Sequence, residues 1–212
     1  MEQTHLIGPA IMYNYDVHNL YEKIEQDMEQ AQHEDGLVPD ICPEYITEFA
    51  KWHYGFLDSP EWGSACIINP WYVYKKYGDT AIFARHYDTM KKYMDYLTGK
   101  THHHVLRHGL GDWLDIGPFV PHSQNTPIPV VATCIYYYDL DIMRSVAEIL
   151  GKTQDAKDYA QLMREVKREY NLQFFDDQGC RYGTGSQTAQ AMSLMTGLVE
   201  EEYEQKVFEV LV

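Results

Sequence analysis

The residues best suited to chemistry in this chain lie in one short stretch, Gly109–Pro118, where Asp112 stands directly before Trp113. A carboxylate beside a flat ring suits a sugar, because the acid accepts hydrogen bonds from hydroxyls while the ring packs against C–H groups. The stretch belongs to an irregular segment, Thr98–Pro127, and connections longer than about 12–15 residues are usually functional or disordered. Its glycines, prolines and tryptophan are not typical of disorder. A tryptophan in the core, with Asp112 capping a turn, explains these ten residues equally well.

Acids next to tryptophans extend this reading. Hydrolysis of a glycosidic bond requires two carboxyl groups, which in inverting enzymes stand about 6.5–9.5 Å apart to admit a water molecule. Glu61 precedes Trp62 just as Asp112 precedes Trp113. Glu61 also fits the role of an acid in the first turn of a helix, where it stabilises the helix dipole. The other acids expected near the same site are Glu2, Asp35, Asp40, Glu44 and Asp115.

Composition narrows the class of ligand. The 212 residues carry 17 basic and 32 acidic side chains, a net charge of −15, which argues against a nucleic-acid partner because phosphate binding needs a basic face. Eighteen tyrosines and four tryptophans in such an acidic chain suit a neutral polar ligand such as a carbohydrate. No apolar run approaches the roughly 20 residues of a membrane span, and the N-terminus does not have the form of a signal peptide. The cellular compartment stays open.

Metal and cofactor signals are weak. The four cysteines are widely spaced without a Cys-x-x-Cys pair, which is not a zinc framework and favours buried free thiols. The run His102–His104 has no acidic partner at ligand spacing, and three consecutive residues cannot all face one ion, so we expect no metal site there. Phosphate-loop, nucleophile-elbow and dinucleotide motifs are missing, and we expect no cofactor.

Apolar residues recur with helical spacing along most of the chain. Mostly apolar helices alternate with amphipathic ones, joined by short turns at Gly78 and Gly151 and separated by long loops. A short helical turn is possible at Tyr45–His53. The predicted helices cover Pro9–Gln32, Trp62–Tyr77 (buried on all sides, with Pro70 as a kink), Thr80–Leu97, Ile128–Leu150, a helix beginning after Thr153, Thr188–Leu198 and Glu200–Val212. The predicted loops are His33–Ser59, Thr98–Pro127 and Phe174–Gly185.

This alternation predicts an all-α fold of helical hairpins packed side by side, with inner helices surrounded by outer ones. Seven helices are too few for a closed ring of twelve, so we predict part of an (α/α)6 toroid. The long loops then lie on one side, where the inner helices start. This places Trp62, Gly109–Pro118 and Gly185–Gln187 around a common mouth, with the two indoles facing each other across a hollow. His5, near the same mouth, is a possible sugar contact.

Several blocks resemble one known family. They are Asp35–Pro43, Pro60–Ala65, Pro70-Trp71, Tyr77–Asp79 and Gly109–Trp113. In order and approximate spacing they are similar to the bacterial α-L-rhamnosidases of glycoside hydrolase family 78, and the resemblance covers essentially the whole chain. It implies an (α/α)6 catalytic barrel and inverting hydrolysis of terminal α-L-rhamnose, with Trp62 and Trp113 lining the rhamnose pocket.

The resemblance also implies where the catalytic acids lie. In the family, the general acid precedes a Gly-Trp-x-x-Asp segment, and this chain begins inside that segment, with Glu2-Gln3 where the pattern usually ends in Asp. The general base belongs to a later loop, beyond Val212. We therefore expect residues 1–212 to be a fragment of a single catalytic domain that lacks its first and last segments, with both catalytic residues outside it and little activity alone. The expected substrate-binding residues are Trp62, Trp113, Asp112, Glu61, Glu2 and His5.

Two other functions are compatible with the pattern. One is an (α/α)6 glycosidase for a different sugar, and the other is a non-catalytic helical array that binds a sugar or a protein. A truncated ring would also expose apolar helix faces at its ends, and large patches of that kind promote association. We therefore expect a homo-oligomer.

Overall fold

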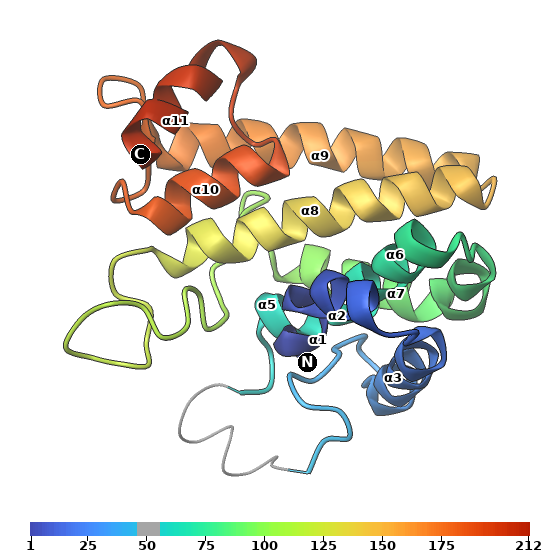
Figure 1. Ribbon diagram of the computed structural model, residues 1–212. Helices are drawn as coiled ribbons and strands as arrows, with labels where there is room; N and C mark the ends of the chain where they lie inside the picture. Colours follow the sequence, from blue (N-terminus) through green and yellow to red (C-terminus); the bar gives the residue numbers. More distant parts are fainter. Residues whose placement is uncertain (46–55) are drawn as a thin grey trace.

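The computed structural model describes residues 1–45 and 56–212, and these are mostly helical (Figure 1). The predicted helical turn at Tyr45–His53 lies outside the described residues, apart from Tyr45. The elements are α1 (Glu2–Leu6), α2 (Gly8–Asn14), α3 (His18–Ala31), α5 (Pro60–Gly63), α6 (Ala65–Tyr77), α7 (Ala81–Lys100), α8 (Ile128–Ile149), α9 (Thr153–Phe174), β1 (Phe175–Asp176), β2 (Arg181–Tyr182), α10 (Gln187–Thr196), the 3-10 turn η1 (Glu201–Tyr203) and α11 (Glu204–Leu211).

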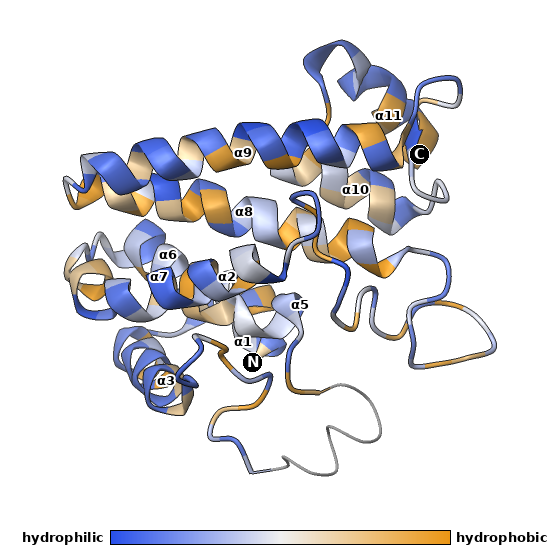
Figure 2. Ribbon diagram, turned by 180° about the vertical axis from the view of Figure 1, so that it is seen from behind, coloured by the Kyte–Doolittle hydropathy of each residue, from blue (hydrophilic) through white to orange (hydrophobic). Residues whose placement is uncertain are grey.

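The prediction of helical hairpins with inner and outer helices is confirmed. Helix α8 is the central inner helix, since it contacts α6, α7, α9 and α10. It buries most of its residues, whereas α9 buries only Ala156, Tyr159, Val166 and Tyr170. Figure 2 shows the same contrast, because α9 is mostly hydrophilic along its length. The arrangement is part of an (α/α)6 toroid.

Loop placement follows the hairpin geometry. Gly78 (φ +72°) and Gly151 (φ +70°) take the left-handed conformation that ends α6 and α8, and a tight turn leads directly into the next helix. In Figure 1 these two turns lie on the right, while the long segment 101–127 lies on the left, where α8 begins. The predicted gathering of long loops at the starts of the inner helices is therefore observed.

Two predicted helices are each broken in two. The helix predicted at Pro9–Gln32 stops at Asn14 and restarts at His18, with Tyr15 extended between them. Its supposed apolar face included Tyr13 and Leu20, which are 84% and 54% exposed, so the apolar spacing did not mark one buried surface. The helix predicted at Trp62–Tyr77 is likewise divided by Ser64 into α5 and α6.

Burial and local structure differ from prediction in two more places. The α6 residues Ala65–Pro70 are buried, but the second half of the helix is partly exposed and ends in exposed lysines, so the helix is not buried on all sides. The predicted loop Phe174–Gly185 contains a short antiparallel hairpin, in which Phe175 pairs with Tyr182.

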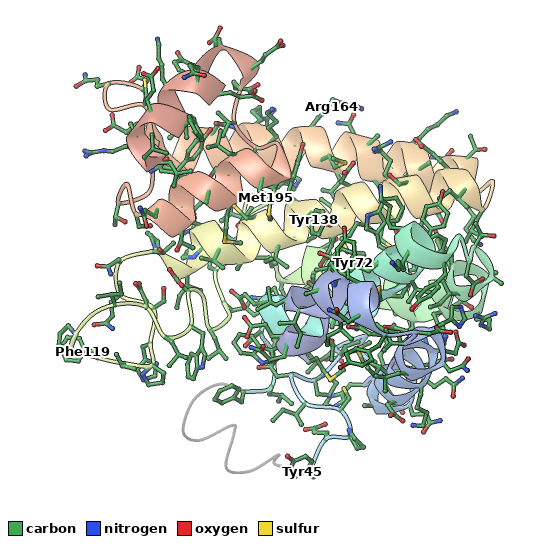
Figure 3. All side chains as sticks on the ribbon, viewed as in Figure 1. Tyr45, Tyr72, Phe119, Tyr138, Arg164 and Met195 are labelled. Carbon is green, nitrogen blue, oxygen red and sulfur yellow. The ribbon has the colours of Figure 1, made fainter. Side chains whose placement is uncertain are left out.

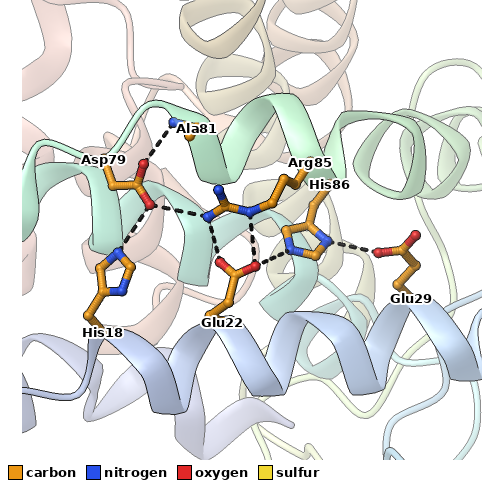
Figure 4. Close-up of polar contacts among 7 residues, drawn as sticks. All are labelled: His18, Glu22, Glu29, Asp79, Ala81, Arg85 and His86. Carbon is orange, nitrogen blue, oxygen red and sulfur yellow. Dashed lines mark hydrogen bonds and ion pairs between the residues drawn. The ribbon is translucent and has the colours of Figure 1, made fainter.

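A polar cluster joins α3 to α7 (Figure 4). The His86 ring is 4% exposed and lies between two carboxylates, with Nδ1 2.9 Å from Glu29 and Nε2 3.3 Å from Glu22. The Arg85 guanidinium donates two hydrogen bonds to the same Glu22 carboxylate, at 2.9 and 2.7 Å. Asp79 bridges Arg85 and His18 at the start of α7. These charged contacts hold the N-terminal helices against the first hairpin.

Candidate functional site

An aromatic cluster stands at the side of the molecule where the long loops gather. The Trp62 and Trp113 rings contact each other edge to face, with centroids 6.3 Å apart, and the Phe56 ring contacts both. The ring of His122 lies 6.1 Å from that of Trp113. The two indoles are therefore neighbours, as predicted, but they pack directly against each other and do not face each other across a hollow. Trp62 is 7% exposed and Trp113 is only partly buried, so Trp113 offers the more accessible indole.

Glu61 holds the Gly-Asp-Trp loop in place. Its carboxyl group is 4% exposed, and its Oε1 accepts the backbone N–H of Gly111 at 3.0 Å. Gly109 has a φ of +127°, and a Cβ at this position would stand 2.7 Å from Oε2 of Glu61. Burial raises the pKa of Glu61 to about 8, against the smaller opposing effect of backbone hydrogen bonds. Close packing on a buried acid therefore explains Gly109, whereas a Cβ at Gly111 would stand 3.0 Å from Ile128 and Ser123. A direct contact between Glu61 and a sugar stays a prediction.

Residues of helix α1 and of the segment before α5 contact α5 and its start. His5 is 5% exposed, its Nε2 lies 2.8 Å from the carbonyl oxygen of Glu61, and burial lowers its pKa. Asp40 is fully buried and accepts the backbone N–H of Ser59 at 2.8 Å, and burial raises its pKa to about 7. Glu2 is partly exposed, with a pKa raised by burial. His5 thus contacts the backbone that carries Trp62, while sugar contacts by His5 and Glu2 stay predictions.

Asp112 connects the loop to the start of α10. The hydroxyl of Thr126 donates to Oδ2 of Asp112 at 3.1 Å, and its oxygen lies 2.8 Å from Oγ of Ser186. Ser186 is the N-cap of α10, where its Oγ accepts the backbone N–H of Ala189 at 3.2 Å. Segments predicted to share a mouth, Gly109–Pro118 and Gly185–Gln187, are therefore joined by hydrogen bonds.

Asp115 organises the rest of the loop. Its Oδ2 accepts backbone N–H groups of Gln124, Asn125 and Thr126 at 2.8, 2.5 and 3.2 Å, and its Oδ1 accepts the Asn125 side-chain amide at 2.9 Å. Burial alone would raise the pKa of Asp115, but these hydrogen bonds hold it well below its usual range. The carboxylate closes residues 116–124 into a compact loop. Figure 3 shows Phe119 at the outer tip of that loop.

These residues enclose a hollow of about 610 Å³ between the loop and the start of α10. Sequence reasoning placed Gly109–Pro118 and Gly185–Gln187 at the common mouth, which includes the lining residues from Asp112 to Ile116. It missed Gln124–Thr126, Thr184 and Thr188, which carry no motif. The lining consists of Asp112, Leu114, Asp115, Ile116, Gln124, Asn125, Thr126, Thr184, Gly185, Ser186, Gln187 and Thr188, and is called the Asp112–Gln187 hollow below. Neither tryptophan lines it.

The described residues, 1–45 and 56–212, hold neither a metal-binding cluster nor a membrane-spanning helix. In this part of the chain, three or more His, Cys, Asp or Glu side chains nowhere gather as they would around a metal ion. Cys42, Cys66, Cys134 and Cys180 are free, and only Cys66 and Cys134 are buried. The helices of the same residues include none with the length and hydropathy to cross a membrane.

The chain is thus an array of helical hairpins whose long loops gather carboxyl and aromatic side chains on one side. Residues 1–212 match the family model described as the bacterial alpha-L-rhamnosidase 6 hairpin glycosidase domain, and the chain belongs to this family. The predicted family resemblance is confirmed.

Individual relatives agree with this assignment. An alpha-L-rhamnosidase of Formosa agariphila is 26% identical over 201 residues, which cover 93% of this chain and 21% of that protein. An alpha-L-rhamnosidase of Alteromonas sp. is 28% identical over 201 residues, which cover 92% and 21%. The chain spans about a fifth of the length of these curated relatives.

Solved structures are similar over the whole chain. The alpha-L-rhamnosidase of Dictyoglumus thermophilum superposes with a TM-score of 0.89 at 28% identity, covering 100% of this chain and 23% of that one. The Streptomyces avermitilis alpha-L-rhamnosidase complexed with L-rhamnose has a TM-score of 0.87 at 23% identity, covering 99% and 19%, and shows the shared fold.

Proposed function

We propose that residues 1–212 form part of the (α/α)6 catalytic domain of an inverting α-L-rhamnosidase and supply part of the surface that binds terminal α-L-rhamnose. Family membership supports the proposed activity, and one observation supports the location of the binding site. The partly exposed Trp113 indole is adjacent to Asp112, and the buried Glu61 carboxyl group accepts the backbone N–H of Gly111 directly before them. An indole face and a fixed hydrogen-bond acceptor are the two groups that a rhamnose ring needs on one side.

Four acids near this surface accept hydrogen bonds from protein groups, which gives them a positioning role. Asp40, Glu61 and Asp115 each accept at least one backbone N–H group, and Asp112 accepts the hydroxyl of Thr126. Inverting hydrolysis needs one carboxyl group that protonates the leaving oxygen and another that activates water. We assign both roles to residues of the whole enzyme outside this chain, which contributes positioning and binding.

Tryptophan fluorescence during titration with L-rhamnose tests the binding site. We expect quenching in the wild-type chain, loss of the response in Trp113→Ala and a weaker response in Trp62→Phe, which keeps a ring in the cluster. Trp71→Phe is the control, because Trp71 stacks on Phe83 within the first hairpin. No response in the wild-type chain, or an unchanged response in both site variants, would contradict the proposal.

The proposal also predicts that the 212-residue chain does not turn over an aryl α-L-rhamnoside at a measurable rate. General acid or base assistance contributes typically about 10²–10⁴-fold for each group, so a chain that lacks both retains little catalysis. Ready turnover by this chain would refute the assignment of the acid and base.

Self-association is a further part of the proposal. Large apolar side chains of α9, α10 and α11 are exposed, among them Leu172 (76%), Met195 (68%) and Phe208 (48%). Exposed apolar surface promotes association. We expect a dimer or larger species in sedimentation velocity, and a single monomer peak across the concentration range would contradict this expectation.

A further inference from the structure

The Asp112–Gln187 hollow lies next to the aromatic cluster but is separate from it. Asp112 lines the hollow, and the following residue, Trp113, belongs to the cluster. The hollow therefore begins beside the residue that carries the partly exposed indole. We propose that the hollow is a second sugar-binding subsite, which receives an uncharged saccharide unit joined to the rhamnose. This inference rests on the proposed function.

The walls of the hollow are fixed before any ligand arrives. Thr126 is 2% exposed and its hydroxyl bridges Asp112 to Ser186, while Ser186 also caps α10. Asp115 binds the backbone of residues 124–126 on the other side. The hydroxyl of Thr184 donates to the carbonyl of Asn125 and closes the gap between the two walls. A pre-formed site loses little conformational entropy on binding, which favours affinity.

The chemistry of the lining suits a neutral sugar. Gln187 and Thr188 carry an amide and a hydroxyl that can both donate to and accept from sugar hydroxyls. The side-chain donors of Asn125 and Thr184 already bind protein oxygens, so these two residues offer acceptor oxygens. Leu114 and Ile116, which are 64% and 86% exposed, offer apolar surface for the C–H face of a ring. The volume of about 610 Å³ lies within the usual range of about 300–1,000 Å³ for small-molecule sites.

Charge then excludes acidic sugars. The residues that line the hollow include two carboxylates, Asp112 and Asp115, and neither lysine nor arginine. An anionic unit such as a uronate would be repelled by these carboxylates and would find no cation to compensate for its lost hydration. The geometry therefore selects a neutral sugar over a uronate at this position.

Binding measurements on the chain with three ligands test the inference. They are methyl α-L-rhamnopyranoside, a methyl glycoside of α-L-rhamnosyl-(1→4)-glucose and its glucuronate counterpart. We expect the neutral disaccharide to bind at least about 5-fold more tightly than the monosaccharide, with amide shifts at Gly185, Ser186 and Gln187 that the monosaccharide does not cause. The glucuronate should show no gain.

A substitution that adds a positive charge to the hollow provides a second test of the inference. Gln187 is exposed in the first turn of α10, so Gln187→Lys adds a cation to the hollow without disturbing the core. We expect it to tighten binding of the glucuronate ligand at least about 5-fold. Gln154→Lys is the matched control, because Gln154 is an exposed glutamine in the first turn of α9, at the opposite end of α8.

The outcomes separate this inference from the proposed function. Equal affinity for all three ligands in the wild-type chain, or equal effects of Gln187→Lys and Gln154→Lys, overturns the second subsite and leaves rhamnose binding in place. Failure of all three ligands to bind overturns both.

Discussion

Replacing Glu61 with glutamine should change how stability depends on pH. In the folded chain the pKa of Glu61 is raised from 4.5 to about 8 by burial. Below about pH 4.5 the group is protonated in both the folded and the unfolded chain, so it imposes no penalty. As pH rises, the unfolded chain loses the proton first, and folding becomes less favourable by about 1.4 kcal/mol per pH step until about pH 8.

The size of this effect makes it measurable. Over the full interval it amounts to about 5 kcal/mol, and between about pH 5 and pH 8 to about 4 kcal/mol, a large fraction of the roughly 5–15 kcal/mol that stabilises a typical domain. Glu61→Gln keeps an oxygen that can accept the Gly111 N–H, but it cannot ionise. Because other buried acids such as Asp40 remain in both proteins, their contributions largely cancel in the comparison.

Urea unfolding followed by tryptophan fluorescence at several pH values measures the difference. We expect Glu61→Gln to lose less stability than the wild-type chain as pH rises, so that the two curves diverge by a few kcal/mol near pH 8. Glu202→Gln removes an exposed carboxyl group and serves as the control. Parallel curves for wild type and Glu61→Gln would show that Glu61 is ionised in the folded chain at neutral pH, and would refute the description of it as a buried neutral acid.

Three further substitutions test the packing around the site and the fold. Asp115→Ala should cost about 2–4 kcal/mol of stability, because it leaves three backbone N–H groups without an acceptor. The stability that Asp115 supplies above its ordinary pKa of 3.8 should be lost as pH falls below that value. Urea unfolding and proteolysis of loop 116–124 check both effects. Gly36→Ala should cost about 3 kcal/mol or more of stability, measured by thermal unfolding, since its φ is +100° and the new Cβ would stand 2.4 Å from the Lys92 carbonyl oxygen. Gly99→Ala is the control, because Gly99 lies in open space within α7, and it should gain about 0.5–1 kcal/mol. Arg85→Ala should cost at most about 1 kcal/mol of stability, because its ion pairs are exposed. His86→Ala should cost about 2–4 kcal/mol, because it leaves Glu22 and Glu29 without their buried partner. Equal losses would contradict this account of the α3–α7 contact.

The sequence predicted the hairpins well where local signals agreed. Helix α8 has a long run of apolar residues, and Gly151 forms the turn that follows it. The apolar residues of α9 recur at helical spacing on a single face. Periodicity, turn chemistry and length all indicated the same structure, so the prediction did not depend on tertiary contacts. The hairpin arrangement then placed Trp62 and Trp113 around one mouth, and the structure brings their rings into contact.

Predictions failed where the deciding partner lies far along the chain. Nothing near Ser64 indicates a break between α5 and α6, and the hydroxyl of Ser64 donates to Asp139 on α8, 75 residues away. Glu61 does lie in the first turn of α5, as the sequence indicated, but nothing local shows that its carboxyl group accepts the N–H of Gly111, 50 residues later. The hollow depends on the contact between Thr126 and Ser186 across 60 residues. Spacing rules describe local geometry and carry no information about such distant partners.

The way Asp115 holds its loop has a practical consequence for altering this protein. The carboxylate binds main-chain N–H groups of residues 124–126, so this contact does not depend on the side chains at positions 119 and 120. Phe119 and Val120 are 71% and 58% exposed, whereas His122 packs on Trp113 and the Ser123 hydroxyl donates to the Thr126 carbonyl. We therefore expect substitutions at 119 and 120 to alter the outer surface of the loop and to leave the backbone beneath it in place.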